Sequence, residues 1–567
     1  MSRPAHRHGC RARRLIPAAL ALACAAFAPL SAAPKDKAAP PADEIVEMEG
    51  LTVTAERELP EPEKWHYAAM PGLEVLSKSR GSEARRLSLN FAKFHAALGA
   101  VWPEIVRNTP PVVLILGDYK NNILEPFAPE DGNWKELPKT AMFQYGDGRL
   151  SFGNHEQLFL IVLDACEEGA DEALFRQYLH ILSKYNAVQR PPWFMEGYIQ
   201  NMMKMRKDGM SIVIGQLDKR TEYYFFDIIN KITMHYGDED FNVFFREYPM
   251  LDFQKFFGGK SGRMTAKWAK QCQGFVHMCL YARAGKNGRV GKYKTALKDF
   301  LARLETEPCT EELFKECFGK TYKEWCKEFR KYCEWPAGMY EPLKITIADD
   351  SPLRIAPPEF SAAPEGVSAR IKGDALALAG RTRAALDIMR AARVRGDRSV
   401  PLLASLGLAA GADGQQARAR KLLELAVAGG ATRPRAHTGL AAILLRETGG
   451  ALSPAQLAPV LQRLFAAREL TPALPETYRL IAEAWTRSGT PPAPEHLAVL
   501  DEGVHRFPGD AGLVCQAAEL RARIADYARA RALVAHGPKI TGAGTPARER
   551  LARLQAALPP ETAAPAP

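Results

Sequence analysis

Residues 158–198 read LFLIVLDACEEGADEALFRQYLHILSKYNAVQRPPWFMEGY, and this stretch decides the fold of the central domain. The apolar run at 158–163 predicts a buried strand. The residues after Asp171, which we expect to cap a helix, carry apolar side chains with a helical period. A Pro-Pro pair at 191–192 predicts the start of a second helix. The predicted order is therefore strand, helix, short loop and helix.

This order resembles the gluzincin metallopeptidases, in particular the exported bacterial branch that has Pro-x-Trp-x-x-Glu-Gly after its zinc helix. The resemblance covers about residues 65–335 and implies an α+β metallopeptidase-like fold. In that family the first helix carries HExxH, whose two histidines bind zinc and whose glutamate is the general base. The third zinc ligand is the glutamate of the Glu-Gly helix.

Carried onto this chain, the first histidine position is Arg176, the general base is Gln177, the second histidine is His180 and the third ligand is Glu196. Arg176 cannot ligate zinc, because a guanidinium has only donors and a permanent positive charge. Gln177 cannot take a proton from water. His180 and Glu196 are thus remnant ligands, short of the three protein ligands that hold a catalytic zinc. Trp193, in the loop between the helices, is a candidate binding residue.

The resemblance leads to the hypothesis that Arg176 spans the vacated metal position and pairs with Glu196. His155 and His277 are the other histidines considered as ligands, but core or surface histidines are commoner than ligands. We therefore expect no metal or cofactor. The alternative is an active zinc peptidase with an atypical ligand set.

The amino terminus predicts export, because five arginines between Arg3 and Arg14 precede an apolar run and small residues. We expect residues 1–33 to be a signal peptide, residues 34–62 to be a flexible linker, and the protein to be periplasmic, associated with the cell envelope or secreted. Cys24 is a possible lipid anchor. No later apolar run is long enough for a transmembrane segment.

The net charge of +11 falls to about +6 once the five signal arginines are removed. No basic block interleaved with aromatic residues remains, which argues against a nucleic-acid partner. The length of 567 residues predicts more than one domain.

The composition changes after Lys344, where lysines become rare and Ala, Leu and Arg dominate. We expect the peptidase-like domain at 63–340, a Pro-rich linker at 341–365, helical repeats at 366–557 and a disordered tail at 558–567. Pro401, Pro434, Pro475 and Pro508 recur at the intervals typical of helical repeats and are each expected to open a helix.

The repeat region resembles the tetratricopeptide family and predicts an all-α helical solenoid. Stacked helix pairs form a concave surface that suits a peptide or protein partner, although a rigid spacer fits the pattern equally.

The cysteines of the central domain have two interpretations. Cys272 and Cys279 are seven residues apart on one predicted helix, as are Cys326 and Cys333 on another, so neither pair can bond within its helix. They are either buried small hydrophobic residues or partners in disulfides that join the two helices.

Together these features predict an exported, catalytically inactive metallopeptidase-like protein that binds a peptide or protein. The cleft would hold an extended peptide against an edge strand near 158–163. The alternatives are the active zinc peptidase and a purely structural envelope protein.

Overall fold

A computed structural model of the 567-residue chain describes most of the sequence from residue 61 onward. The predicted signal peptide, the possible lipid anchor at Cys24, almost all of the predicted linker at 34–62 and the end of the predicted tail lie outside the described residues. The described residues are 61–101, 106, 109–118, 120, 123–127, 144–146, 149–167, 169–185, 191–208, 211–217, 245–246, 249–258, 266–285, 288–304, 307–336, 338–346, 354–541 and 545–559.

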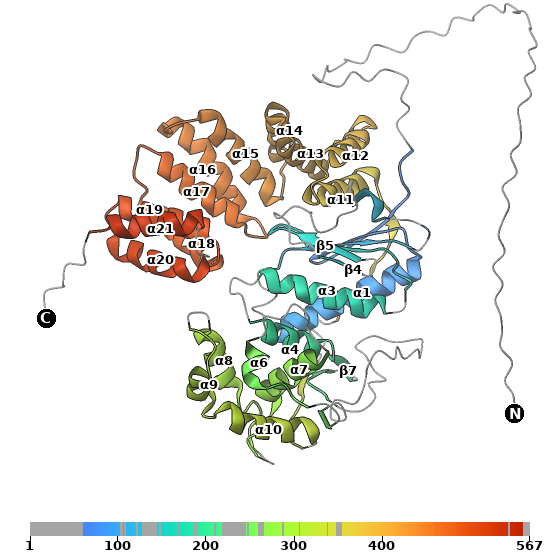
Figure 1. Ribbon diagram of the computed structural model, residues 1–567. Coiled ribbons are helices and arrows are strands. Elements are labelled where there is room, and N and C mark those ends of the chain that lie inside the picture. The colour runs from blue at the N-terminus through green and yellow to red at the C-terminus, as the bar shows by residue number, and fades with distance from the viewer. Residues whose placement is uncertain are drawn as a thin grey trace, which may run out of the picture. The chain divides into compact units, whose positions relative to one another are not determined.

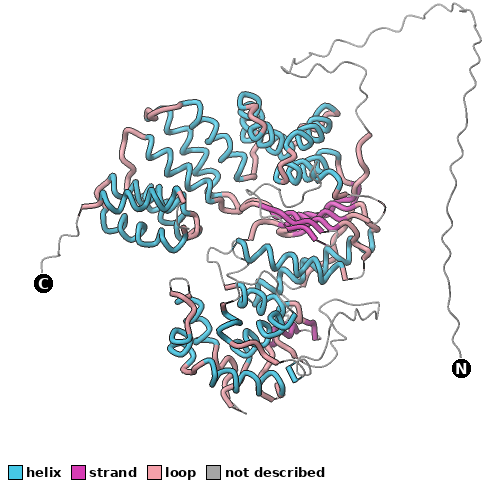
Figure 2. The backbone as a smooth tube through the Cα atoms, viewed as in Figure 1, coloured by secondary structure: helices cyan, strands magenta, loops and turns pink. Residues whose placement is uncertain are grey.

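The main sheet of the described residues has seven strands, seen in magenta in Figure 2. They are β1 (His66–Met70), β2 (Leu73–Ser77), β3 (Val112–Leu116), β4 (Gln144–Gly146), β5 (Arg149–Gly153), β6 (Leu158–Val162) and β10 (Ser361–Ala362). Their order is β10-β1-β2-β3-β6-β5-β4. The central strands β2, β3 and β6 are parallel, and the flanking pairs are antiparallel.

The strand predicted at 158–163 is present as β6, but the expectation that it lies at an edge is wrong. β6 pairs with β3 on one side and with β5 on the other. All five of its residues are buried, as its continuous apolar sequence requires of a strand covered on both faces. The edge next to it is formed by β4. A peptide therefore cannot be held by pairing with β6.

Both faces of the sheet are covered, and successive residues of each central strand alternate between the two sides. Leu158 and Leu160 of β6 pack with α1 (Gly81–Val101) and α3 (Ala170–Tyr185). Phe159 and Ile161 point to the opposite side and share a core with the helices of the carboxyl-terminal part. Figure 1 shows α1 and α3 on one side of the sheet and α11 (Glu365–Leu378) on the other.

Asp171 was expected to cap the helix, but it lies inside the first turn of α3. Its carboxylate instead accepts hydrogen bonds from Arg86 and Asn90, both on α1. It therefore ties the two helices that cover this face of the sheet.

A second, smaller group of elements follows α3. A three-stranded sheet joins β7 (Arg206–Asp208), β8 (Ser211–Ile214) and β9 (Leu343–Thr346). An aromatic core holds the helices α4 (Pro192–Met202), α6 (Phe253–Phe257), α7 (Ala266–Tyr281), α8 (Lys294–Arg303), α9 (Glu311–Phe318) and α10 (Tyr322–Glu334) together. The described part of the chain before residue 347 is thus an α+β domain.

The segment expected to be a linker at 341–365 contributes strands at both of its ends. β9 completes the small sheet by pairing with β8, and β10 pairs with β1 at the edge of the main sheet. Because these strands have four and two residues, neither has enough apolar alternation to be recognised in the sequence.

Eleven helices form the described carboxyl-terminal part, in which neighbouring pairs stack on one another. Pro401, Pro434 and Pro475 lie at the starts of the third, fifth and seventh of them, as predicted. Pro508 does not open a helix, because the next helix begins at Ala511 with Asp510 as its cap. This part is a tetratricopeptide-like solenoid. After α11 its helices are α12 (Thr382–Val394), α13 (Val400–Ala412), α14 (Gln416–Ala428), α15 (Pro434–Thr448), α16 (Pro454–Glu469), α17 (Pro475–Arg487), α18 (Pro494–Arg506), α19 (Ala511–Arg523), α20 (Tyr527–Ile540) and α21 (Pro546–Ala557).

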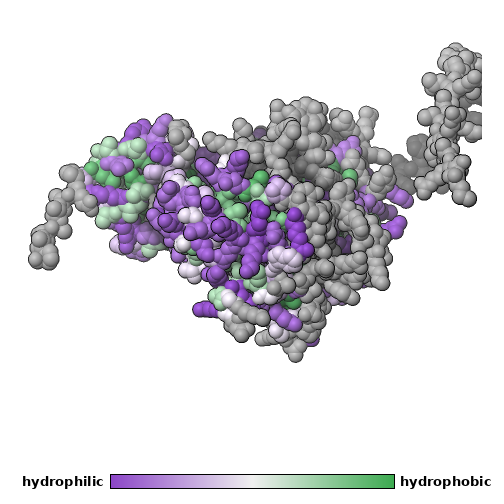
Figure 3. Space-filling view, turned by 60° about the horizontal axis from the view of Figure 1, so that its bottom comes forward, coloured by the Kyte–Doolittle hydropathy of each residue, from purple (hydrophilic) through white to green (hydrophobic). Residues whose placement is uncertain are grey.

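Among the described residues, no helix combines the length and apolar character needed to cross a membrane. On the face shown in Figure 3, hydrophilic residues cover most of the described surface.

Candidate functional site

The four positions carried over from the metallopeptidase motif lie on two helices in the predicted order. Arg176, Gln177 and His180 are on α3, and Glu196 is on α4. Gln177 and Glu196 are buried, whereas His180 is half-buried.

The hypothesis that Arg176 pairs with Glu196 is wrong. Arg176 Nη2 lies 3.5 Å from Glu172 Oε1, one turn earlier on the same helix, and its side chain is 38% exposed. The carboxylate of Glu196 accepts a hydrogen bond of 2.8 Å from Gln200 Nε2 on its own helix. Each charged group is therefore satisfied by a neighbour four residues away, which a helix always brings close.

The residues at these positions do not fit a zinc ion. A guanidinium and an amide occupy two of the four positions, and neither can replace an imidazole ligand or a general base. Among the residues that the structure describes, no group of three or more His, Cys, Asp and Glu side chains is arranged to hold a metal ion.

Trp193, a predicted binding residue, is part of the aromatic core instead. Its side chain is 3% exposed. The ring packs edge-on against Phe257 and Phe275, with centroids 5.2 Å away in both cases. A side chain buried among these rings is not accessible to a ligand.

The glycine of the Glu-Gly pair has a packing role. A Cβ at Gly197 would lie 2.2 Å from the main-chain oxygen of Cys272. Helices α4 and α7 therefore meet backbone to backbone, an approach that only glycine allows.

His277, considered as a substitute ligand, is a core residue. Its Nε2 lies 2.8 Å from the main-chain oxygen of Gly215 and its Nδ1 lies 2.8 Å from the hydroxyl of Tyr332. Nε2 must donate to the carbonyl, and in the neutral ring Nδ1 then accepts from the hydroxyl. Burial lowers the pKa of His277 to about 4. Both ring nitrogens are thereby committed to the fold.

The structure supports the interpretation of the cysteines as small hydrophobic residues, since all eight in the described residues are free thiols. Cys272, Cys279 and Cys333 are buried, and they pack in the same aromatic core as Trp193. The predicted cross-helix disulfides are absent from the part of the chain that the structure describes. The three residues act as small hydrophobic side chains.

The turn between β5 and β6 reaches into the repeats. Glu156, which is 3% exposed, accepts hydrogen bonds of 2.9 Å from Arg433 Nε and from the main-chain nitrogen of Arg435. Arg435 is in the first turn of α15, so the carboxylate of Glu156 lies at the amino-terminal end of that helix, where a negative charge is favoured. Arg433 Nη1 also binds Asp374 and Ser405 of the first two repeats.

His155 extends the same contact to later repeats. Its ring meets Phe507 at a centroid distance of 5.7 Å. Burial lowers the pKa of His155, although the carboxylates of Glu476 and Asp510 act in the opposite direction. A single turn of the α+β domain thus contacts residues at the start of α15 and just after α18, and this part of the solenoid is already occupied.

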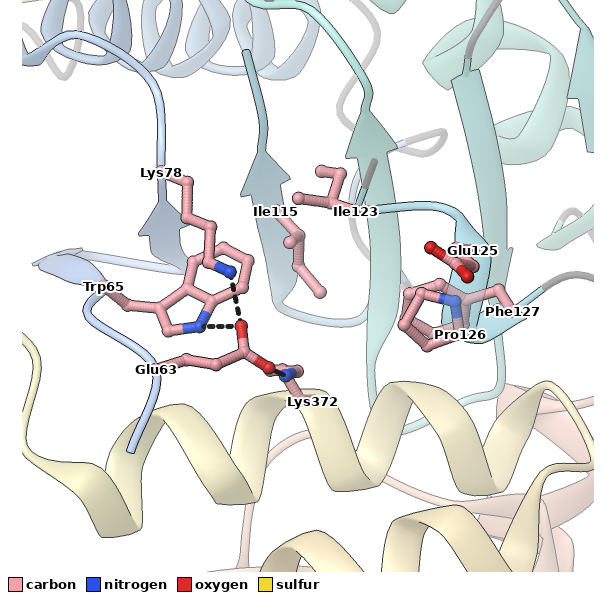
Figure 4. A pocket seen from close by; sticks show the side chains of 9 residues that line it. All are labelled: Glu63, Trp65, Lys78, Ile115, Ile123, Glu125, Pro126, Phe127 and Lys372. Atoms are coloured by element: carbon pink, nitrogen blue, oxygen red, sulfur yellow. Dashed lines mark hydrogen bonds and ion pairs between the residues drawn. The ribbon is translucent and has the colours of Figure 1, made fainter. Parts of the chain in front are cut away.

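A cavity of about 180 Å³ lies between the sheet and α11 (Figure 4). Glu63 at its side accepts hydrogen bonds from Lys78, Lys372 and the indole nitrogen of Trp65. Burial alone raises the pKa of Glu63, but the hydrogen bonds from Lys372 and Lys78 outweigh it and lower the pKa to about 2. Glu63 binds Lys78, which follows β2, and Lys372, which lies on α11. These hydrogen bonds therefore join the sheet side of the cavity to the solenoid.

No protein-family model and no curated protein matches the chain. Among solved structures, it is similar to Pseudomonas aeruginosa pilF (14% identity, 34% of this chain, 90% of that chain, TM-score 0.28) and to YrrB, described as a tetratricopeptide-repeat protein with an unusual peptide-binding site (14%, 34%, 93%, 0.28). A thermophilic tetratricopeptide-repeat protein of Thermus thermophilus is similar at 17% identity, over 34% of this chain and 99% of that chain, with a TM-score of 0.27.

Proposed function

We propose that this chain is an exported protein-binding protein in which a metallopeptidase-like domain no longer hydrolyses peptides. The observation that carries the proposal is the arrangement on α3 and α4. Arg176 pairs with Glu172, and Glu196 is held by Gln200. Arg176 stands where a zinc ligand would be and Gln177 stands where the general base would be, and the remnant ligand Glu196 is held within its own helix.

The repeats are the proposed binding module. A stack of helix pairs presents an extended surface without needing a catalytic group. Part of that surface is filled by the turn with His155 and Glu156, so a partner would use the helices beyond it or the outer face. Export is supported by the arginines and the apolar run at the amino terminus.

The loss of hydrolysis is tested on a purified chain that begins at Pro34, after the predicted signal peptide. We expect elemental analysis to give no stoichiometric zinc and a mixture of denatured protein substrates to remain uncleaved with and without added zinc. One zinc per chain, or hydrolysis that a chelator abolishes, would overturn this half of the proposal. Replacing both His180 and Glu196 by alanine is the control, since a true zinc site would lose its metal.

The binding role is tested in cells by placing a photoreactive amino acid at single exposed positions. Tyr527 on α20 and Leu425 on α14 are exposed positions in the repeats, and Val290 is a matched position in the α+β domain. We expect discrete crosslinked partners at the repeat positions. Crosslinks found at Val290 alone would contradict a repeat-mediated function.

A further inference from the structure

The outer helices of the first two repeats carry an unusual concentration of arginine. Between residues 381 and 421 there are nine lysines and arginines against three acidic residues, a net charge of six positive units. Four of these side chains define what we call the arginine patch: Arg390 and Arg393 on α12, Arg398 just after it, and Arg418 on α14.

The members of the patch lie close together, and two of them share one neutral acceptor. The side-chain oxygen of Gln415 accepts from Arg390 Nη2 at 2.9 Å and from Arg418 Nη1 at 3.4 Å. Arg398 Nη1 donates to the main-chain oxygen of Arg393 at 2.6 Å. These acceptors, a side-chain amide and a main-chain carbonyl, are neutral. A carboxylate would bind a guanidinium group more strongly.

The charge of the patch is poorly compensated. The buried Nη1 of Arg393 has no hydrogen-bond partner among the described residues. Burial, and then the charge of Arg398, lower the pKa of Arg393. Burial, followed by Arg390 and Arg393, lowers the pKa of Arg418 in the same way. An ion pair of the patch, from Arg390 to Asp387, spans 4.0 Å to a side chain that is 76% exposed.

Arginines beside the patch are paired in the ordinary way. Arg395 binds Glu365, and Arg420 binds both Glu424 and Glu447. Weak pairing with carboxylates is therefore not a property of every arginine on these helices.

Two large aliphatic side chains are exposed on the same helices. Val394 follows Arg393 and is 57% exposed, and Leu425 lies two turns beyond Arg418 on α14 and is 53% exposed. Arginine is enriched at protein-binding surfaces, and the exposed aliphatic side chains beside it add apolar area that a partner can cover.

From this juxtaposition we infer that the arginine patch is the docking site for an acidic segment of a partner protein, whose carboxylates bind the guanidinium groups while its apolar residues cover Val394 and Leu425. The inference rests on the proposed function and names the partner's chemistry. Charge complementarity selects the occupant, since planar guanidinium forks match carboxylates in bidentate pairs. Two aliphatic side chains give too little apolar area for a membrane surface, which needs a broad apolar face.

The test uses the chain that begins at Pro34 and a short fluorescent peptide of alternating glutamate and leucine. We expect the peptide to bind, and the same peptide with glutamine in place of glutamate to bind at least about tenfold more weakly. Binding should weaken as salt is raised, because the contact is between charges near solvent. Equal binding of both peptides would overturn the inference.

The patch variant is Arg393→Gln with Arg418→Gln, and its matched control is Arg506→Gln with Arg529→Gln. The control removes the same charge from α18 and α20, where both arginines are exposed and paired with carboxylates. We expect the patch variant to lose at least about tenfold in affinity for the glutamate peptide and the control to lose less than about twofold. Equal losses in the two variants would overturn the inference.

Folding and the other possible occupants are checked on the same proteins. The patch variant should melt no lower than the wild type, because it relieves repulsion between like charges. Vesicles of phosphatidylglycerol that bind the patch more tightly than the peptide does would overturn the inference in favour of a membrane.

If crosslinks still map to the repeats while the glutamate peptide does not bind, the inference fails and the proposed function stands. If the peptide binds but no crosslinks form in cells, the proposed function fails instead.

Discussion

Gly197 lies where helices α4 and α7 touch, and its missing side chain determines how closely they approach. In Gly197→Ala the new Cβ would be 2.2 Å from a main-chain oxygen that cannot rotate away. We expect a loss of about 3 kcal/mol or more in the free energy of unfolding, because relief requires the helices to separate. Chemical denaturation measures this loss.

Gly99→Ala is the matched control, since Gly99 is also helical and a Cβ added there would have its nearest neighbour 4.0 Å away. That substitution should be neutral or stabilise by up to about 1 kcal/mol, because alanine is the better helix former. Similar effects of the two changes would contradict the close crossing of α4 and α7.

His277 makes stability depend on pH. Its pKa is about 4 in the folded protein against 6.5 as the ordinary value, so between these values the unfolded chain binds the extra proton. The stabilisation that neutral His277 gives the folded state is therefore fully present above pH 6.5 and is lost as the pH falls toward 4. The free energy of unfolding decreases by about 3 kcal/mol over this range. His95, whose pKa burial also lowers to about 4, acts in the same direction.

In His277→Gln the side chain is neutral at every pH. We expect the free energy of unfolding to be lower at pH 7.5 but to fall less steeply between pH 6.5 and 4 than in the wild type. Urea titrations at several pH values measure both slopes. Parallel slopes would show that His277 is already protonated in the folded protein.

At the scale of elements, the turn between β5 and β6 is held to the repeats by Glu156. In Glu156→Ala, Arg433 keeps Asp374 but loses its other carboxylate, and the end of α15 loses an acceptor. We expect a cost of about 2 kcal/mol, less than for a buried ion left with no partner. Hydrogen exchange should also become faster in the turn.

Glu519→Ala is the control for this change. Glu519 also joins two helices by binding Arg550, but the side chains of Arg550 and Glu519 are 42% and 33% exposed. Pairs of that kind contribute about 0.5 kcal/mol or less. Equal costs at Glu156 and Glu519 would mean that the turn is not an anchor.

The sequence predicted where helices and strands lie along the chain better than it predicted which elements pack or pair with one another. The strand at 158–162 and the helices that begin at Pro434 and Pro475 follow from local periodicity and from proline at a helix start. The central place of β6 and the pairing of His66 with Ala362 did not follow, because they join segments far apart in the chain.

The candidate site shows the same division. The positions of Arg176 and Glu196 on successive helices could be read from their spacing. The ion-pair partner of each side chain could not be predicted. A residue four positions away on the same helix competes with a residue on another helix, and the sequence does not show which of the two contacts forms.

At the scale of the whole molecule, the sheet and the first repeats share one hydrophobic core. Phe152 and Phe159 of the sheet belong to the same buried cluster as Ile371 and Leu402 of the solenoid. The solenoid is therefore the second covering layer of the sheet, which an open α/β sheet needs on both faces.

This shared core predicts that the two halves cannot be separated. A chain ending at residue 346 would leave the Phe152 and Phe159 face of the sheet in water, a large apolar patch of the kind that causes aggregation. We expect that fragment to be insoluble or to bind a hydrophobic dye, and to become soluble when residues 354–567 are produced with it. A chain ending at Thr541 is the control, because it removes only α21, whose Leu551 packs in a small cluster of its own. A soluble fragment that unfolds cooperatively and binds no dye would contradict the shared core, since the repeats would then be an independent module attached to a complete domain.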